Sequence, residues 1–232
     1  FIWSTTVTLL LTKLRSYSNM RTHFHHPSLS LLFLLISEIF SSSVQDLIGA
    51  VGDSVTFPLS VPVSGNIIYN SNTVGQVLNK QSDTELSEKF VNRLQWVSQS
   101  GFFTLSDLRT DDSGLYTLQS TKEQKGKQDY QLEVYERVSA PQLMNTTSSS
   151  SEFCSFLCSV RNVRGLKLSV YEDGVLLNRS SSSSNTSDIT LNLHLEIKKT
   201  NNHRERTFSC VASNPVSNKT TSILTHSCSL NT

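Results

Sequence analysis

The chain has 232 residues and an almost balanced charge, with 20 Lys and Arg against 19 Asp and Glu. At the usual ~100–200 residues per domain, this length allows one or two domains. No cluster of basic residues supplies the phosphate-neutralising surface of a nucleic-acid-binding protein. A glycine-rich phosphate loop and the HExxH and GxSxG motifs are also missing. We therefore predict no nucleic-acid partner, no enzyme, no small-molecule substrate and no cofactor.

Residues 20–43 have the layout of a secretory signal peptide, with a basic start, a short apolar core and small residues after it. Residues 1–19 precede this segment, and we interpret them as upstream or fragment residues. Three histidines resemble a metal cluster, His23, His25 and His26, but they fall in the segment expected to be removed, so we predict no metal site.

No later stretch approaches the ~18 apolar residues that a membrane span requires. The protein is therefore either secreted or held by a membrane anchor beyond this chain. We favour the anchor, which predicts the extracellular side of the plasma membrane.

Beyond residue 44, short alternating segments separated by Ser, Asn, Gly and Asp predict an all-β chain. The predicted strands of the first half are 54–59, 67–70, 74–78, 102–105, 115–119 and 131–135. Those of the second half are 153–160, 166–171, 189–197, 207–212 and 221–225. Because each half has about the ~100 residues of an immunoglobulin sandwich, we predict two tandem sandwiches, over residues 44–136 and 137–232.

The string Asp112-Ser113-Gly114-Leu115-Tyr116 is typical of the turn that enters strand F of an immunoglobulin domain. Gly114 permits the tight entry, and the Tyr116 hydroxyl is expected to bond back to the backbone as a tyrosine corner. Arg93 is the expected partner of Asp112 across the base of the sandwich.

Leucines stand where a variable-type domain usually has its disulfide. Leu118 lies two residues after Tyr116, and Leu59 continues the alternation of Val55 and Phe57 on the opposite strand. Two buried leucines contribute ~1.5–3 kcal/mol each, comparable with the ~4 kcal/mol of a bridge closing a loop of that length. We therefore predict a variable-type first domain without a disulfide.

All four cysteines lie in the second half, at Cys154, Cys158, Cys210 and Cys228. An even count in one segment favours two disulfides over a zinc site, because only the first pair has zinc-ligand spacing. Phe208-Ser209-Cys210 matches the strand-F string, which makes Cys158 the strand-B partner of Cys210. The remaining pair predicts a second, enclosing bridge, Cys154–Cys228, in a constant-like domain.

A variable-type domain without a disulfide, followed by a constant-like domain with two bridges, resembles the ectodomain of the SLAM family of leukocyte receptors. The resemblance covers residues 45–228 and rests on the combination, since no single motif is unique to that family. It implies a cell-surface immune recognition or adhesion receptor that binds itself or a related immunoglobulin-family receptor on another cell. The alternative is a soluble secreted immunoglobulin-like binder, such as a decoy or cytokine-binding protein.

Asn-x-Ser/Thr sequons predict where the binding surface does not lie. They occur at Asn145, Asn178, Asn185 and Asn218, all at the junction or in the second domain. The bare first domain is therefore the predicted binding end, through the front sheet that the resemblance implies. Strand alternation predicts these outward-facing residues on that sheet: Asn70, Gln76, Leu115, Thr117, Gln119, Gln131 and Glu133. The competing interpretation is that they are only solvated surface residues.

Overall fold

A computed structural model describes residues 43–122, 126–146, 153–182, 189–198 and 205–225. Within these ranges the secondary structure consists of strands and one short 3₁₀ turn, Thr110–Asp112, and no helix is long and apolar enough to cross a membrane. The predicted signal segment and upstream residues, except Ser43, lie outside the described residues, as do Asn185 and Cys228.

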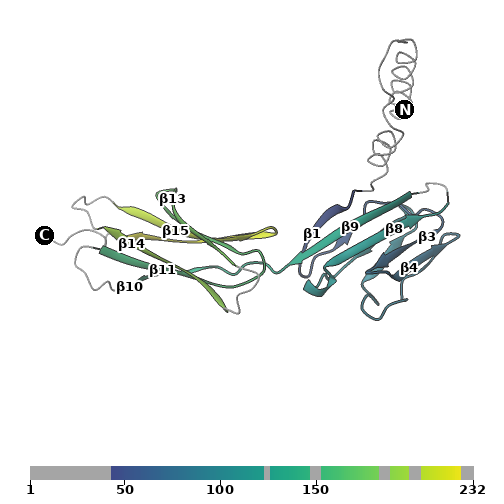
Figure 1. Cartoon of the computed structure of the whole chain (residues 1–232), viewed down its shortest axis with the longest axis horizontal. Helices are drawn as coiled ribbons and strands as arrows, with labels where there is room; N and C mark the ends of the chain where they lie inside the picture. The colour runs from purple at the N-terminus through teal and green to yellow at the C-terminus, as the bar shows by residue number, and fades with distance from the viewer. Residues whose placement is uncertain (1–42, 123–125, 147–152, 183–188, 199–204, 226–232) are drawn as a thin grey trace, which may run out of the picture. The chain divides into compact units, whose positions relative to one another are not determined.

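The strands of the first half form two facing sheets, which we call the first sandwich (Figure 1). The six-stranded sheet has the order β1 (Gln45–Ala50), β9 (Gly126–Tyr135), β8 (Gly114–Ser120), β3 (Gly65–Tyr69), β4 (Asn72–Leu78) and β5 (Gln81–Asp83). The three-stranded sheet has the order β2 (Val55–Thr56), β7 (Phe102–Leu105) and β6 (Leu94–Val97). Strand β1 runs parallel to β9, whereas the other neighbours pair antiparallel.

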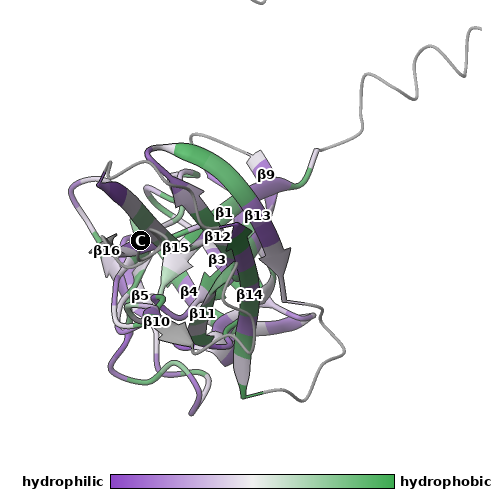
Figure 2. Cartoon of the chain, turned by 90° about the vertical axis from the view of Figure 1, so that its left-hand side faces the viewer, coloured by the Kyte–Doolittle hydropathy of each residue, from purple (hydrophilic) through white to green (hydrophobic). Residues whose placement is uncertain are grey.

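The second half likewise forms two sheets, which we call the second sandwich. The three-stranded sheet has the order β10 (Gln142–Thr146), β11 (Phe153–Arg161) and β14 (Thr190–Lys198). The four-stranded sheet has the order β13 (Val175–Ser181), β12 (Lys167–Glu172), β15 (Arg206–Asn214) and β16 (Ser217–Thr225). Figure 2 shows both hydrophobic and hydrophilic segments along the strands, as expected where one face is buried and the other is exposed.

An aromatic cluster fills the core of the first sandwich. The Phe57 ring lies 5.0 Å from the Tyr116 ring and 5.7 Å from the Tyr130 ring, measured between centroids. Leu118 and Ile67 are fully buried in the same cluster, whereas Leu59, which the sequence predicted to be buried, is only partly buried against it. Aromatic and aliphatic packing therefore joins the two sheets at the level where a disulfide is usual.

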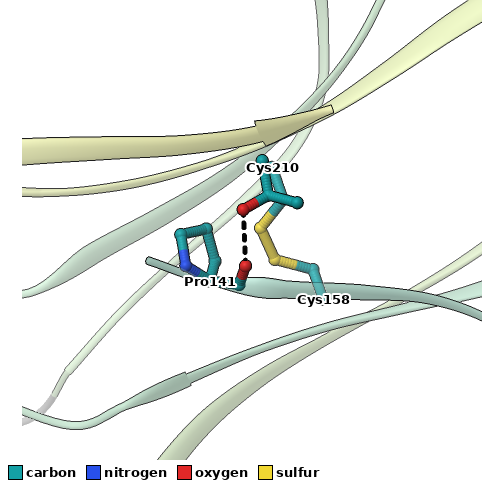
Figure 3. Close-up of a disulfide and its surroundings, with 4 residues drawn as sticks. Pro141, Cys158 and Cys210 are labelled. Carbon is teal, nitrogen blue, oxygen red and sulfur yellow. Dashed lines mark hydrogen bonds between the residues drawn. A yellow bond between two sulfur atoms is a disulfide. The ribbon is translucent and has the colours of Figure 1, made fainter. Parts of the chain in front are cut away.

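A disulfide joins the sheets of the second sandwich. The bond connects Cys158 on β11 to Cys210 on β15, as predicted, and both residues are fully buried (Figure 3). Beside it, the Thr221 hydroxyl donates a hydrogen bond to the Pro141 carbonyl over 2.6 Å. Cys154 is also buried, but its predicted partner Cys228 lies outside the described residues, so the second bridge remains a prediction.

A buried ion pair closes the base of the first sandwich. Both guanidinium nitrogens of Arg93 donate to the Asp112 carboxylate, over 2.6 and 2.9 Å. Arg93 also donates to the carbonyls of Asp107 and Lys89, and Asp112 accepts from the backbone amide of Arg109. The hydrogen bond to Asp112 raises the pKa of Arg93 above its ordinary value.

The tyrosine corner is attached to the same aspartate. The buried Tyr116 hydroxyl donates to the Asp112 carbonyl over 2.8 Å, and burial raises the pKa of this phenol. Gly114 has φ +154°, and a Cβ there would lie 2.8 Å from the ring of Tyr69. Asp112, Gly114 and Tyr116 of the motif therefore each have a specific geometric basis.

The all-β class is confirmed for the described residues, and the strand predictions differ in detail. Phe102–Leu105 coincides with its prediction, whereas β9 begins five residues before the predicted Gln131. Strand β2 is confined to Val55–Thr56, because Pro58 has no amide hydrogen for a ladder bond. Five strands were not predicted at all, namely β1, β5, β6, β10 and β13.

Replacing Asp112 with Ala should lower the free energy of unfolding of the first sandwich by about 3–5 kcal/mol, because it leaves the buried Arg93 charge without its partner. Trp96 is the only tryptophan beyond the predicted signal segment, so its fluorescence during urea unfolding reports on this sandwich. Arg109→Ala removes an exposed pair with Asp107 and should change stability by about 1 kcal/mol or less. Equal losses in the two variants would contradict this assignment.

Candidate functional site

The outward face of the six-stranded sheet is built from residues that alternate with the core. On β8, Tyr116, Leu118 and Ser120 are buried, which places Leu115, Thr117 and Gln119 on the opposite face. Leu115 is 41% exposed, whereas Thr117 and Gln119 are half-buried among their neighbours. One strand thus supplies both the core and the middle of the candidate surface.

Strand pairing extends this face in rows across the sheet. Gln119 lies opposite Asn66 on β3 and Lys127 on β9, and Asn66 in turn lies opposite Gln76 on β4. Directly paired residues of antiparallel strands point to the same face, so this row carries three amide side chains and one lysine. On the other side of Gln76, Asp83 on β5 ends this row at the edge of the sheet.

The next row is centred on a hydrogen-bonded pair. The Thr117 hydroxyl donates to the Asp129 carboxylate over 2.6 Å, and Thr117 also lies opposite the half-exposed Ile68. Below it, Leu115 lies opposite Gln131, which is paired with Asp46 on β1. Leu115 and Ile68 are apolar residues within these polar rows, and two more exposed apolar residues lie toward the edges of the same face, Ile48 on β1 and Leu78 on β4.

Two predicted surface residues have positions that differ from a simple outward orientation. Asn70 follows the end of β3 in a left-handed conformation, with φ 44°, and its side-chain oxygen accepts a hydrogen bond from the Leu115 amide. Glu133 forms an ion pair with Arg164 over 2.8 Å and accepts a hydrogen bond from the Tyr135 hydroxyl. That hydrogen bond raises the pKa of Tyr135.

The structure adds residues to this face that the sequence analysis missed. They are Asp46, Ile48, Asn66, Ile68 and Asp129. Asp129 could have been found by extending the alternation of Gln131 and Glu133 toward the N-terminus. Asp46 and Ile48 gave no such signal, because Gln45–Ala50 does not alternate between apolar and polar residues.

The near-zero total charge hides an asymmetry between the two halves. Residues 44–136 contain twelve acidic and seven basic residues, whereas residues 137–232 contain ten basic and six acidic residues. Within the first sandwich, Lys122 and Lys127 lie at the end of the six-stranded sheet where β8 stops and β9 begins. Lys122 donates to the Asn79 side chain over 2.7 Å, which brings the neighbouring turn with Lys80 to the same end.

The acidic residues of the face lie mainly farther along the sheet. Asp129 is in the middle row, opposite Thr117, and Asp46 lies beside Gln131 in the next row. Asp83 is the exception, since it shares the row of Lys127 at the opposite edge. The face therefore has a lysine-rich end and an aspartate-bearing middle.

The predicted glycosylation sites lie on strands of the second sandwich where the structure describes them. Asn178 is exposed on β13, Asn218 is exposed on β16, and Asn145 lies on β10. In the described ranges, no group of three or more His, Cys, Asp or Glu residues is arranged to hold a metal ion.

Sequence comparison identifies curated human relatives of one kind. SLAM family member 7 is 29% identical over 196 residues, T-lymphocyte surface antigen Ly-9 is 28% identical over 202, and SLAM family member 5 is 25% identical over 206. The chain is similar in sequence to these SLAM-family receptors. The predicted resemblance is thereby confirmed, although no protein-family profile matches the chain.

These alignments cover 81–82% of this chain but only 57%, 30% and 53% of the three relatives, in the same order. The chain therefore spans only part of the length of each of these relatives.

Solved structures support the fold. The CD2-binding domain of CD58 is similar with a TM-score of 0.59 and 23% identity, over 78% of this chain and 96% of that one. The ectodomain of mouse nectin-like molecule 4 gives a TM-score of 0.53 and 18% identity, over 78% and 66% of the two chains. At these identities the likeness establishes the immunoglobulin-like architecture.

Two leucines on β8 provide a test of the inward and outward assignment. Leu118→Ala should lower the free energy of unfolding by about 2–5 kcal/mol, because it leaves a cavity in the core. Leu115→Ala should change it by no more than about 0.5 kcal/mol, as for other surface positions. Urea unfolding followed by Trp96 fluorescence measures both changes. A larger loss of stability in Leu115→Ala than in Leu118→Ala would contradict the assignment of Leu118 to the core.

Proposed function

We propose that the chain is the extracellular part of an immune-cell adhesion or recognition receptor, and that its binding surface is the outward face of the six-stranded sheet. The observation that carries this proposal is the combination of SLAM-family homology with a sequon-free sheet face in residues 44–136. We assign residues 44–136 to a variable-type binding domain and residues 137–232 to a constant-like domain.

The composition of this face suits a reversible contact between cells. Leu115 and Ile68 provide a small apolar centre, and amides and hydroxyls from Asn66, Thr117 and Gln119 surround it. Protein interfaces commonly combine an apolar centre with a polar rim, and a small centre gives limited affinity. The predicted residues Gln76 and Gln131 belong to the rim, and Asn70 borders Leu115.

The charge pattern supports self-binding. In a face-to-face dimer with its two-fold axis perpendicular to the strands, the two sheets run in opposite directions. The lysine-rich end of one copy then approaches the aspartate-bearing region of the other. A related receptor with the same polarity would fit equally well, so the partner class is this chain itself or a related immunoglobulin-family receptor.

We assign the second sandwich to a glycosylated stalk on the extracellular side of the plasma membrane. The four sequons, Asn145, Asn178, Asn185 and Asn218, all lie near or within it, where bulky glycans leave the first sandwich accessible. The membrane contact in this proposal is an anchor outside this chain.

Charge reversal tests self-binding. One variant reverses the lysine-rich end, with Lys122→Glu and Lys127→Glu, and a second reverses the middle, with Asp46→Lys and Asp129→Lys. Each variant alone should self-associate at least tenfold more weakly than the parent, because like charges meet. An equimolar mixture of the two should recover association, and the parent's association should weaken as salt rises. Sedimentation equilibrium measures the self-association of each variant, the association in the mixture and the salt dependence of the parent.

Gln95→Lys on the three-stranded sheet is the matched control, because Gln95 is exposed on the sheet that faces away from the proposed surface. The variant should bind like the parent. If the parent neither self-associates nor binds any SLAM-family ectodomain in surface plasmon resonance, the receptor proposal is wrong. If it binds a relative but not itself, only the self-binding part fails.

The second bridge has its own test. Peptide mapping without reduction should recover Cys154 linked to Cys228, together with Cys158 linked to Cys210. A free thiol at Cys228, or a different linkage of Cys154, would exclude the two-bridge domain. The Cys158–Cys210 peptide serves as the internal control because the structure describes that bond.

A further inference from the structure

Strand β13 is an open edge with exposed apolar side chains. It is the terminal strand of the four-stranded sheet, and β12 is its neighbour in that sheet. Val175 is 65% exposed, Leu176 is 45% exposed and Leu177 is 38% exposed. Three consecutive aliphatic residues are therefore exposed on a strand whose outer edge pairs with no other strand among the described residues.

This combination favours pairing with another chain. An edge strand presents a row of backbone N–H and C=O groups, and exposed apolar residues add a favourable contact for any strand that joins it. Strand β13 has a register irregularity opposite Val170 and Tyr171, and one charged residue, Arg179. The irregularity falls at Leu177, which has no direct partner on β12, and Arg179 lies two residues farther along; Val175, Leu176 and Leu177 all remain exposed.

A sequon lies on this same strand, directly after the apolar residues. Asn178 is exposed, and its side-chain oxygen accepts a hydrogen bond from the Arg179 amide over 2.8 Å. An N-linked glycan is attached through the amide nitrogen, so this hydrogen bond is compatible with modification. Leu177 and Val175 lie one and three residues from Asn178, which is within about 10 Å along an extended strand.

The described sequons share a position in the sheets. Asn178 and Asn218 lie on β13 and β16, the two terminal strands of the four-stranded sheet. Asn145 lies on β10, a terminal strand of the other sheet. The residues that follow Asn218 are Lys219 and Thr220, whereas those that precede Asn178 are aliphatic. Among the described residues, three consecutive exposed aliphatic residues precede the sequon on β13, whereas one exposed apolar residue, Met144, precedes the sequon on β10.

We propose that the N-glycan on Asn178 covers the apolar edge of β13 and prevents it from pairing with a strand of another chain. The first sugars of the glycan present apolar C–H faces to Val175, Leu176 and Leu177, and the hydrated branches exclude a further strand. This role goes beyond the proposed stalk, because it assigns the glycan a contact and a consequence for the oligomeric state.

The test uses the whole chain, secreted from cells that glycosylate it. Asn178→Gln and Ser180→Ala both remove the sequon, and the second leaves the asparagine in place. Both variants should form dimers or larger species, with a molar mass by light scattering at least twice that of the parent. Amide hydrogen exchange in β13 should slow in these species. Asn218→Gln, on the opposite edge of the same sheet, should keep the parent's mass.

A second substitution makes the cause explicit. Adding Leu176→Thr and Leu177→Thr to Asn178→Gln should restore the parent's mass, because it removes the apolar residues that favour pairing. All proteins in this series carry Asp46→Lys and Asp129→Lys, so that association through the first sandwich does not contribute. If Asn178→Gln keeps the parent's molar mass, as Asn218→Gln is expected to do, the proposal is wrong. It is also wrong if the parent is monomeric by light scattering while mass spectrometry finds its Asn178 unmodified.

Discussion

The alternation of side chains along β8 is the constraint on which the first sandwich depends. Its inward residues, Tyr116 and Leu118, join the aromatic core, and the Tyr116 hydroxyl is bonded to the backbone of Asp112. The Arg93 guanidinium holds the Asp112 carboxylate from the other side. Because the strand period is two, fixing the inward residues also fixes which residues face outward. The packing of the core and the composition of the outward face are therefore set by one register.

Much of this arrangement could be predicted from residues whose chemistry allows few alternatives. The Asp112–Tyr116 motif located strand F, and the position of Cys210 relative to Phe208 located its counterpart in the second half. The outward positions of Leu115, Thr117 and Gln119 then followed from alternation. These predictions were accurate because a buried ion pair, a corner hydroxyl and a disulfide each require a specific residue type.

The residues that were missed have weaker local signals. Strand β13 reads Val-Leu-Leu-Asn-Arg-Ser-Ser, without alternation, because all but one of its residues are exposed. Strand β1 is held by parallel pairing with β9, a long-range contact that its own sequence does not indicate. The engagement of Glu133 by Arg164 similarly joins residues 31 positions apart. Edges and ion pairs of this kind depend on the assembled fold rather than on a local pattern.

The different means of joining the sheets give the two sandwiches different requirements for their surroundings. Apolar packing in the first sandwich does not depend on an oxidant, whereas Cys158 and Cys210 need one to form their bond. A bacterial cytoplasm, which keeps thiols reduced, is therefore a suitable host for the isolated first sandwich but not for the second. The same difference means that a reducing agent should loosen the second sandwich while the first keeps its packing.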